Sequence, residues 1–167
     1  MKNKEIKEYL PSEDDLKSIR EEIDAIFNDP YRIHKYPFYE GGGRTVVIID
    51  KFAVKFPEEC DSAKVAGNSQ NKKEYMVYKE TKHPLLNPVY EEYRGCLICK
   101  EIIGDLYVLI HDYNFNYNEI LSEINCKVNL LSPLIEKYSL DIGDLESPRN
   151  WGYDLSIKEF VCLDYGI

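Results

Sequence analysis

The chain carries residues of the types that phosphoryl transfer from a nucleotide requires. That reaction needs a backbone that approaches phosphates closely, a fixed cation on them, and oxygen ligands that hold magnesium. The run Gly41, Gly42 and Gly43 in "GGGRTVV" can supply the backbone, and Lys55 in "FAVKF" can supply the cation from the following strand. Glu74 comes nineteen residues later on an expected helix, where it can pair with Lys55 and hold it in place.

Candidate oxygen ligands occur near the end of the sequence. The segment "DLESPRNWG" contains Asp144 and Asn150, and "LDYG" contains Asp164, fourteen residues after Asn150. Burying several charged groups together is costly unless they pair with one another or bind a ligand. A structure that brings these side chains together would therefore indicate a functional site.

Each of these residues also has an ordinary structural interpretation. Lys55 can be a solvated residue of an edge strand, and Glu74 can pair locally with Lys72 or Lys73 on the helix surface. Asp164 can belong to a simple turn, because aspartate and glycine are common turn residues. Taken one by one, these residues leave the ordinary interpretations open, and the ordinary one is the more common for Lys55.

Four segments follow one another in a distinctive order: "GGGRTVV", "AVKFP", the "NSQNKKEYMVY" helix and "RNWGYD…VCLDYGI". In this order they resemble the protein-kinase-like superfamily, and more narrowly the short kinase-like proteins carried by bacteriophages and mobile elements. The resemblance covers about residues 40 to 167. It implies a minimal protein-kinase-like fold of the α+β class, with an antiparallel N-lobe sheet, one flanking helix and a truncated helical C-lobe. The cofactors that it implies are ATP and magnesium.

The resemblance also implies roles for individual residues. Lys55 matches the lysine of the third strand, and Glu74 matches the helix glutamate that pairs with it. Asn150 and Asp164 match the two magnesium ligands. The backbone from Glu101 to Ile103 falls where the hinge between the lobes would contact adenine.

Some positions differ from the family pattern. Six steps rather than five separate Asp144 from Asn150, and "IGDL" replaces the usual His-Arg, so both Asp144 and Asp141 are candidates for the base that accepts the acceptor's proton. Arg44 follows the glycines at the place of the phosphate cover. Only Ile167 follows "DYG", so we expect any acceptor to bind another surface.

Two functions follow from the resemblance. The first is a phage- or mobile-element-type protein that binds ATP with magnesium but acts mainly as a protein-binding module, for example as an inhibitor of a host defence or regulatory complex. Phosphotransfer would then be weak or absent, because positioning the acceptor supplies much of the rate enhancement. The alternative is an active minimal phosphotransferase that uses ATP to modify a protein or a small molecule.

The surrounding sequence predicts the elements that would position these residues. "SEDD" is a helix start, and apolar residues recur at helical spacing from Leu16 to Phe27. Hairpins are expected over 45–56 and 89–100, two short strands around a turn over 150–154 and 159–164, and helices over 69–80, 120–128 and 132–138. At 167 residues the chain is expected to form one domain, with a helical extension over about 1–39, a sheet-rich part over 40–103 and a helical part over 104–167.

Composition excludes several other classes. The net charge of −9 makes direct binding to nucleic acid or anionic membrane unfavourable and suits a basic surface on a protein partner. The sequence contains no apolar stretch of membrane-spanning length and no signal peptide, so a cytoplasmic location is expected. Cys96 and Cys99 have CxxC spacing, but no second pair follows, so we do not expect structural zinc.

Overall fold

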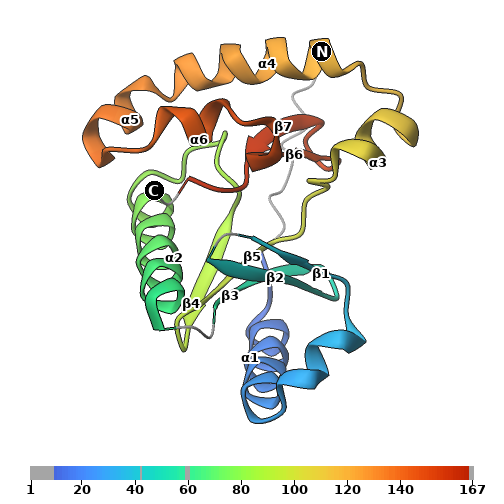
Figure 1. The fold of residues 1–167 in the computed structure, drawn as a ribbon, viewed down its shortest axis with the longest axis vertical. Helices are drawn as coiled ribbons and strands as arrows, with labels where there is room; N and C mark the ends of the chain where they lie inside the picture. Colours follow the sequence, from blue (N-terminus) through green and yellow to red (C-terminus); the bar gives the residue numbers. More distant parts are fainter. Residues whose placement is uncertain (1–9, 42, 59–60, 166–167) are drawn as a thin grey trace.

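A five-stranded antiparallel sheet occupies the middle of the molecule (Figure 1). The computed structural model describes residues 10–41, 43–58 and 61–165, and within 61–66 it describes the backbone only. The sheet has the order β1-β2-β3-β5-β4. Its strands are β1 (Phe38–Glu40), β2 (Arg44–Ile49), β3 (Phe52–Pro57), β4 (Val89–Tyr93) and β5 (Cys96–Lys100).

Helices lie on two sides of this sheet (Figure 1). The helix α1 and the 3-10 helix η1 lie below it in this view, α2 runs along one side, and a helical half with a second sheet of two strands lies above it. These elements are α1 (Glu13–Asn28), η1 (Pro30–Lys35), α2 (Asp61–Thr81), α3 (Leu106–His111), α4 (Tyr117–Leu130), α5 (Ser132–Tyr138), α6 (Ile142–Glu146), η2 (Pro148–Asn150), β6 (Trp151–Asp154) and β7 (Glu159–Cys162).

The helix α1 begins at the predicted position. The Asp15 amide donates to the Ser12 hydroxyl over 3.1 Å, and the Ser12 amide donates to the Asp15 carboxylate over 3.0 Å. This reciprocal capping satisfies two amides that a helix start leaves without partners. Ile19, Ile23 and Ile26 lie on the buried side of α1, where they share a hydrophobic core with one face of the sheet.

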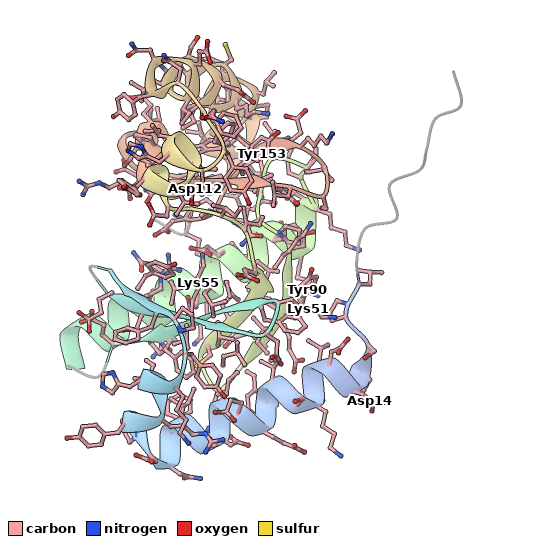
Figure 2. All side chains as sticks on the ribbon, turned by 90° about the vertical axis from the view of Figure 1, so that its right-hand side faces the viewer. Asp14, Lys51, Lys55, Tyr90, Asp112 and Tyr153 are labelled. Carbon is pink, nitrogen blue, oxygen red and sulfur yellow. The ribbon has the colours of Figure 1, made fainter. Side chains whose placement is uncertain are left out.

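The register of β2 and β3 decides which side chains face α1 and which face the helical half. Val47 pairs with Val54, and both belong to the core that contains α1. Val46 pairs with Lys55, and side chains of directly paired residues point to the same side of a sheet. In Figure 2 Lys55 lies on the side of the sheet toward the helical half, where Tyr153 lies. The sheet therefore presents Lys55 to the space between the two halves.

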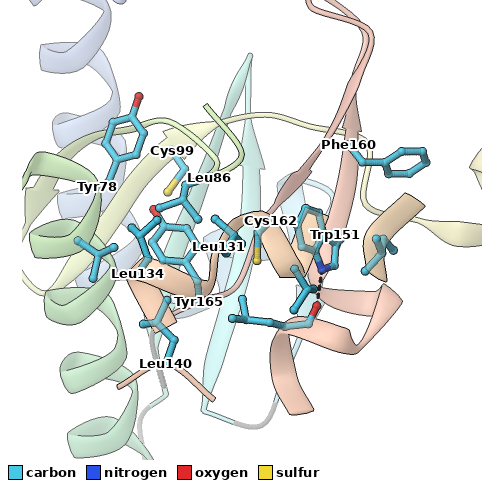
Figure 3. Packing of buried hydrophobic residues seen from close by; sticks show 14 of the residues in the cluster. Tyr78, Leu86, Cys99, Leu131, Leu134, Leu140, Trp151, Phe160, Cys162 and Tyr165 are labelled. Atoms are coloured by element: carbon cyan, nitrogen blue, oxygen red, sulfur yellow. Dashed lines mark hydrogen bonds between the residues drawn. The ribbon is translucent and has the colours of Figure 1, made fainter. Parts of the chain in front are cut away.

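A second core joins α2 to the helical half (Figure 3). Trp151 is fully buried in it, and its indole N–H donates to the Leu145 carbonyl over 2.6 Å. The segment after α2 is also tied to β7, because the Cys162 amide donates to the Leu85 carbonyl over 2.7 Å and the Asn87 amide donates to the Cys162 carbonyl over 2.9 Å. These contacts place the residues after β7 beside the sheet-rich half.

The predicted α+β class is confirmed, and so is the central prediction about the sheet. Hairpins 45–56 and 89–100 join one antiparallel sheet through the pairing of β3 with β5, and α2 packs against it. The predicted start of the helix near residue 69 was wrong, because α2 begins at Asp61. Gly67 explains the error: glycine disfavours a helix interior, but a Cβ here would lie 2.3 Å from the Gly43 carbonyl oxygen, so only glycine allows this packing.

Two further expectations concern metals and membranes. Cys96 and Cys99 belong to different hydrophobic cores on opposite faces of the sheet, so their thiols cannot share a metal ion. Burial raises the pKa of the Cys99 thiol to about 12. Within the described residues, no helix is long and apolar enough to cross a membrane.

Candidate functional site

Lys55 and Glu74 form a buried ion pair between β3 and α2. The Lys55 ammonium lies 2.5 Å from one carboxylate oxygen of Glu74, and their side chains are only 6% and 0% exposed. Lys55 also donates to the main-chain carbonyl of Leu163 over 2.5 Å. The predicted pairing of Lys55 with Glu74 is confirmed, and the lysine in addition reaches the segment that follows β7.

Arg44 is the second cation of this cluster. It is the first residue of β2 and its side chain is 6% exposed. One of its terminal nitrogens donates to Glu74 over 2.7 Å and to the Asn71 side-chain oxygen over 3.0 Å. The other lies 2.6 Å from a carboxylate oxygen of Asp164. Arg44 therefore connects α2 to the segment after β7, and the charges of both carboxylates raise its pKa although burial alone would lower it.

Asp164 remains ionised because of these two cations. Burial alone would raise the pKa of its carboxyl, but the positive charges of Arg44 and Lys55 and the hydrogen bond from Arg44 lower it to about 2. Its side chain is 42% exposed, so it is the open member of the cluster. The arrangement contains two cations and two carboxylates, which balance one another.

Asn150 and Asp144 lie next to this cluster. The Asn150 carbonyl accepts from the Leu163 amide over 2.7 Å and from the Asp164 amide over 3.4 Å. The two predicted magnesium ligands, Asn150 and Asp164, therefore lie in adjacent segments of the chain. The Asn150 side chain donates to the Asp144 carbonyl over 2.8 Å. Partial desolvation, followed by the charges of Asp141 and Asp164, raises the pKa of Asp144.

The two candidate bases lie at the start of α6. The Asp141 carboxylate accepts from the Asp144 amide over 3.1 Å and thereby caps this helix. Both side chains are exposed. Asp141 thus has a structural task that the sequence did not indicate, whereas the charges of Asp141 and Asp164 act on the carboxyl of Asp144.

A cavity of about 440 Å³ lies between the sheet and the helical half. Lys55 reaches it from the sheet and Arg149 from the helical half. The segment from Glu101 to Gly104 lines it, so both predicted hinge residues, Glu101 and Ile103, are at its wall. Its remaining lining comes from Tyr39, Val46, Ile48, Ala53, Asn87, Lys100, Asp105, Val108 and Leu163. Most of these side chains are apolar, which suits a flat ring system.

The glycine segment joins β1 to β2. The Gly41 amide donates to the Arg44 carbonyl over 2.9 Å, and the Gly43 carbonyl accepts from Glu58 over 3.1 Å. Gly42 lies outside the described residues. Gly41 and Gly43 do not line the cavity, so their contact with phosphates stays a prediction.

The pairing of Asp164 with Arg44 opposes a magnesium ion at this carboxylate, because the guanidinium is a fixed positive charge. Magnesium is held by carboxylate and other oxygen atoms in near-octahedral geometry. In the described part of the chain, no three His, Cys, Asp or Glu side chains are grouped so that they could hold a metal ion. One oxygen of Asp164 is paired with Arg44, whereas Asn150 donates its side-chain nitrogen, and not its oxygen, to the Asp144 carbonyl.

Sequence reasoning missed two parts of this site. Arg44 was noted only as a departure in the glycine segment, although it pairs with Glu74 and Asp164. Arg149 was not singled out, although it precedes Asn150 and lines the cavity. The hairpin register contains the signal for Arg44: it lies two residues before Val46, the partner of Lys55, so it belongs to the same face.

Comparison of the chain with protein-family models, with curated proteins and with solved structures found no match.

Proposed function

We propose that the chain has a minimal kinase-like fold, binds an adenine nucleotide in the cavity between its two halves, and acts by binding a protein partner rather than by transferring phosphate. The observation that carries the proposal is the position of the cavity. It lies between a buried lysine that is fixed by a carboxylate, Lys55, and the segment Glu101–Ile103 that the sequence resemblance makes the hinge.

The size and lining of the cavity suit a nucleotide base. About 440 Å³ falls within the range of small-molecule sites, which are mostly apolar with a few polar groups that fix the ligand. Val46 and Ala53 line it from the sheet, and Val108 and Leu163 line it from the other half. A flat base can pack between these two sets of apolar side chains.

The polar groups suit the charged end of the same ligand. Lys55 lines the cavity and is held in place by Glu74, so it is a fixed cation of the kind that phosphates bind. Arg149 brings a second positive charge to the cavity from the helical half. A phosphate that binds a fixed cation loses less free energy to side-chain ordering than one that binds a mobile cation, because the side chain is already ordered.

Nucleotide binding is favoured over phosphoryl transfer because the Asp164 carboxylate is already paired with a cation of the protein. Phosphotransfer enzymes use this position to hold the metal that neutralises charge on the transferred phosphate. Here the carboxylate is paired with Arg44 over 2.6 Å. The sequence resemblance to phage and mobile-element proteins makes a host protein complex the expected partner, and the net charge of −9 suits a basic surface on it.

Isothermal titration with ATP, ADP and AMP tests nucleotide binding. We expect one site, and we expect Ala53→Ile to weaken binding at least tenfold, because it adds a branched side chain to the cavity wall while suiting a strand. Thr45→Ile is the matched control, since Thr45 lies in the adjacent strand and is not part of the cavity lining. Equal loss in both variants, or no binding by the unmodified chain, would contradict the proposal.

A phosphotransferase remains the second candidate, and the raised pKa of Asp144 favours it because a more basic carboxylate accepts a proton more readily. Incubation with labelled ATP and magnesium separates the two functions. We expect the unmodified chain to transfer no more phosphate than the Asp144→Asn variant does. Efficient transfer to a defined acceptor that is lost in both Asp144→Asn and Lys55→Met would establish the enzyme instead.

A further inference from the structure

The contact between Arg44 and Asp164 has features that an ordinary surface ion pair lacks. The guanidinium is buried, with its side chain 6% exposed, and it is bonded at both ends. On one side it lies 2.7 Å from Glu74 and 3.0 Å from the Asn71 oxygen, and on the other 2.6 Å from Asp164. Such bonds position a planar guanidinium in a fixed orientation.

A divalent cation at Asp164 would lie next to this fixed positive charge. Two like charges a few ångströms apart repel strongly where little water separates them. Arg44 cannot turn away without leaving Glu74 with only one of its two cationic partners, Lys55. The cluster therefore disfavours a metal ion.

We infer that Arg44 takes the place of a divalent cation at Asp164, so that the cavity binds its nucleotide without magnesium. This inference rests on the proposed nucleotide binding for its ligand, but the exclusion of metal from Asp164 can be measured separately. The positive charge that phosphates need is then supplied by the protein, through Lys55 and Arg149 at the cavity. The positive charge of Arg44 prevents a metal ion from binding to Asp164.

Manganese, a spectroscopic substitute for magnesium, tests the exclusion of metal without nucleotide. Electron paramagnetic resonance measures Mn²⁺ binding to the unmodified chain, Arg44→Gln, Asp164→Asn and the double variant. We expect the unmodified chain to bind Mn²⁺ no better than Asp164→Asn does. Arg44→Gln should gain a site at least tenfold tighter, because its side chain is neutral, and the double variant should lose that site again.

ATP affinity measured with magnesium and with a chelator tests the second half of the inference. The unmodified chain should bind ATP equally under both conditions, within about twofold of each other. Arg44→Gln should bind ATP at least tenfold more tightly with magnesium, which corresponds to about 1.4 kcal/mol.

Several results would overturn the inference. These are Mn²⁺ binding by the unmodified chain that Asp164→Asn abolishes, a tenfold gain in its ATP affinity on adding magnesium, or a folded Arg44→Gln that gains no metal site. If Arg44→Gln does not fold, comparing Mn²⁺ binding by the unmodified chain and by Asp164→Asn still shows whether Asp164 binds metal. Absence of ATP binding under both conditions would refute the proposed function, and the manganese titration would then decide the role of Arg44 independently.

Discussion

Replacing Glu74 by glutamine should destabilise the fold strongly. Glu74 is fully buried, and its two oxygens lie 2.7 Å from Arg44 and 2.5 Å from Lys55. The Glu74→Gln variant keeps the shape of the side chain but leaves two buried cations with one fewer partner. Breaking a buried pair in this way typically costs about 3–5 kcal/mol. Total stabilities of domains are about 5–15 kcal/mol, so the variant should fold but unfold at a much lower urea concentration.

Urea denaturation followed by circular dichroism measures this loss. The matched control is Glu21→Gln, because Glu21 also pairs with a lysine, Lys17, but over 4.0 Å and with side chains 69% and 68% exposed. Exposed pairs contribute at most about 1 kcal/mol, so the control should remain close to the unmodified chain. A loss of less than about 1 kcal/mol in Glu74→Gln would refute the claim that the buried cations depend on this carboxylate.

Two further predictions concern packing and pH. Gly67→Ala should destabilise the fold by about 1–3 kcal/mol, because its Cβ would lie 2.3 Å from the Gly43 carbonyl oxygen; an unchanged urea midpoint would contradict this packing. Burial would raise the pKa of Asp154, but hydrogen bonds from Lys100 and Ser156 lower it below its ordinary value of 3.8. Its stabilising effect is therefore complete above that value and is lost as the pH falls through the folded-state pKa, so Asp154→Asn should lose less stability than the unmodified chain between pH 6 and pH 3. Equal losses in urea titrations at the two pH values would contradict this assignment.

The elements that local sequence determines were predicted well. The start of α1 was predicted because Ser12 and Asp15 form a capping pair within four residues. The hairpin of β2 and β3 was predicted because β-branched and aromatic residues flank a short polar turn. In both cases the interactions that define the element lie within a few residues of one another.

Elements that depend on distant contacts were not predicted. Gly67, in the second turn of α2, packs against the Gly43 carbonyl, and nothing near Gly67 in the sequence indicates that contact. The short helix α6 was also missed: Asp141 was considered only as a candidate base, whereas its carboxylate caps this helix. A single aspartate before a short apolar segment does not distinguish a cap from a catalytic residue.

The candidate site was predicted only in part, because some of its contacts join residues that lie far apart in the sequence. The pairing of Lys55 with Glu74 was predicted from their order in the sequence. The contact of Arg44 with Asp164 joins residues 120 positions apart, and it requires the return of the chain after β7 to the sheet-rich half. The sequence resemblance assigned Asp164 to a metal, whereas the structure pairs it with Arg44.

The most direct test of the central claim is the mapping of nucleotide binding by nuclear magnetic resonance. Backbone amide signals of the ¹⁵N-labelled chain are recorded while ADP is added. The account predicts saturable shifts at Ile102, Ile103 and Gly104 and at Leu163, which line the cavity. Amides of α1 around Ile19 and Ile23 should not move, because they lie on the other side of the sheet. Shifts that avoid the cavity, or a spectrum that ADP leaves unchanged, would contradict nucleotide binding at this site.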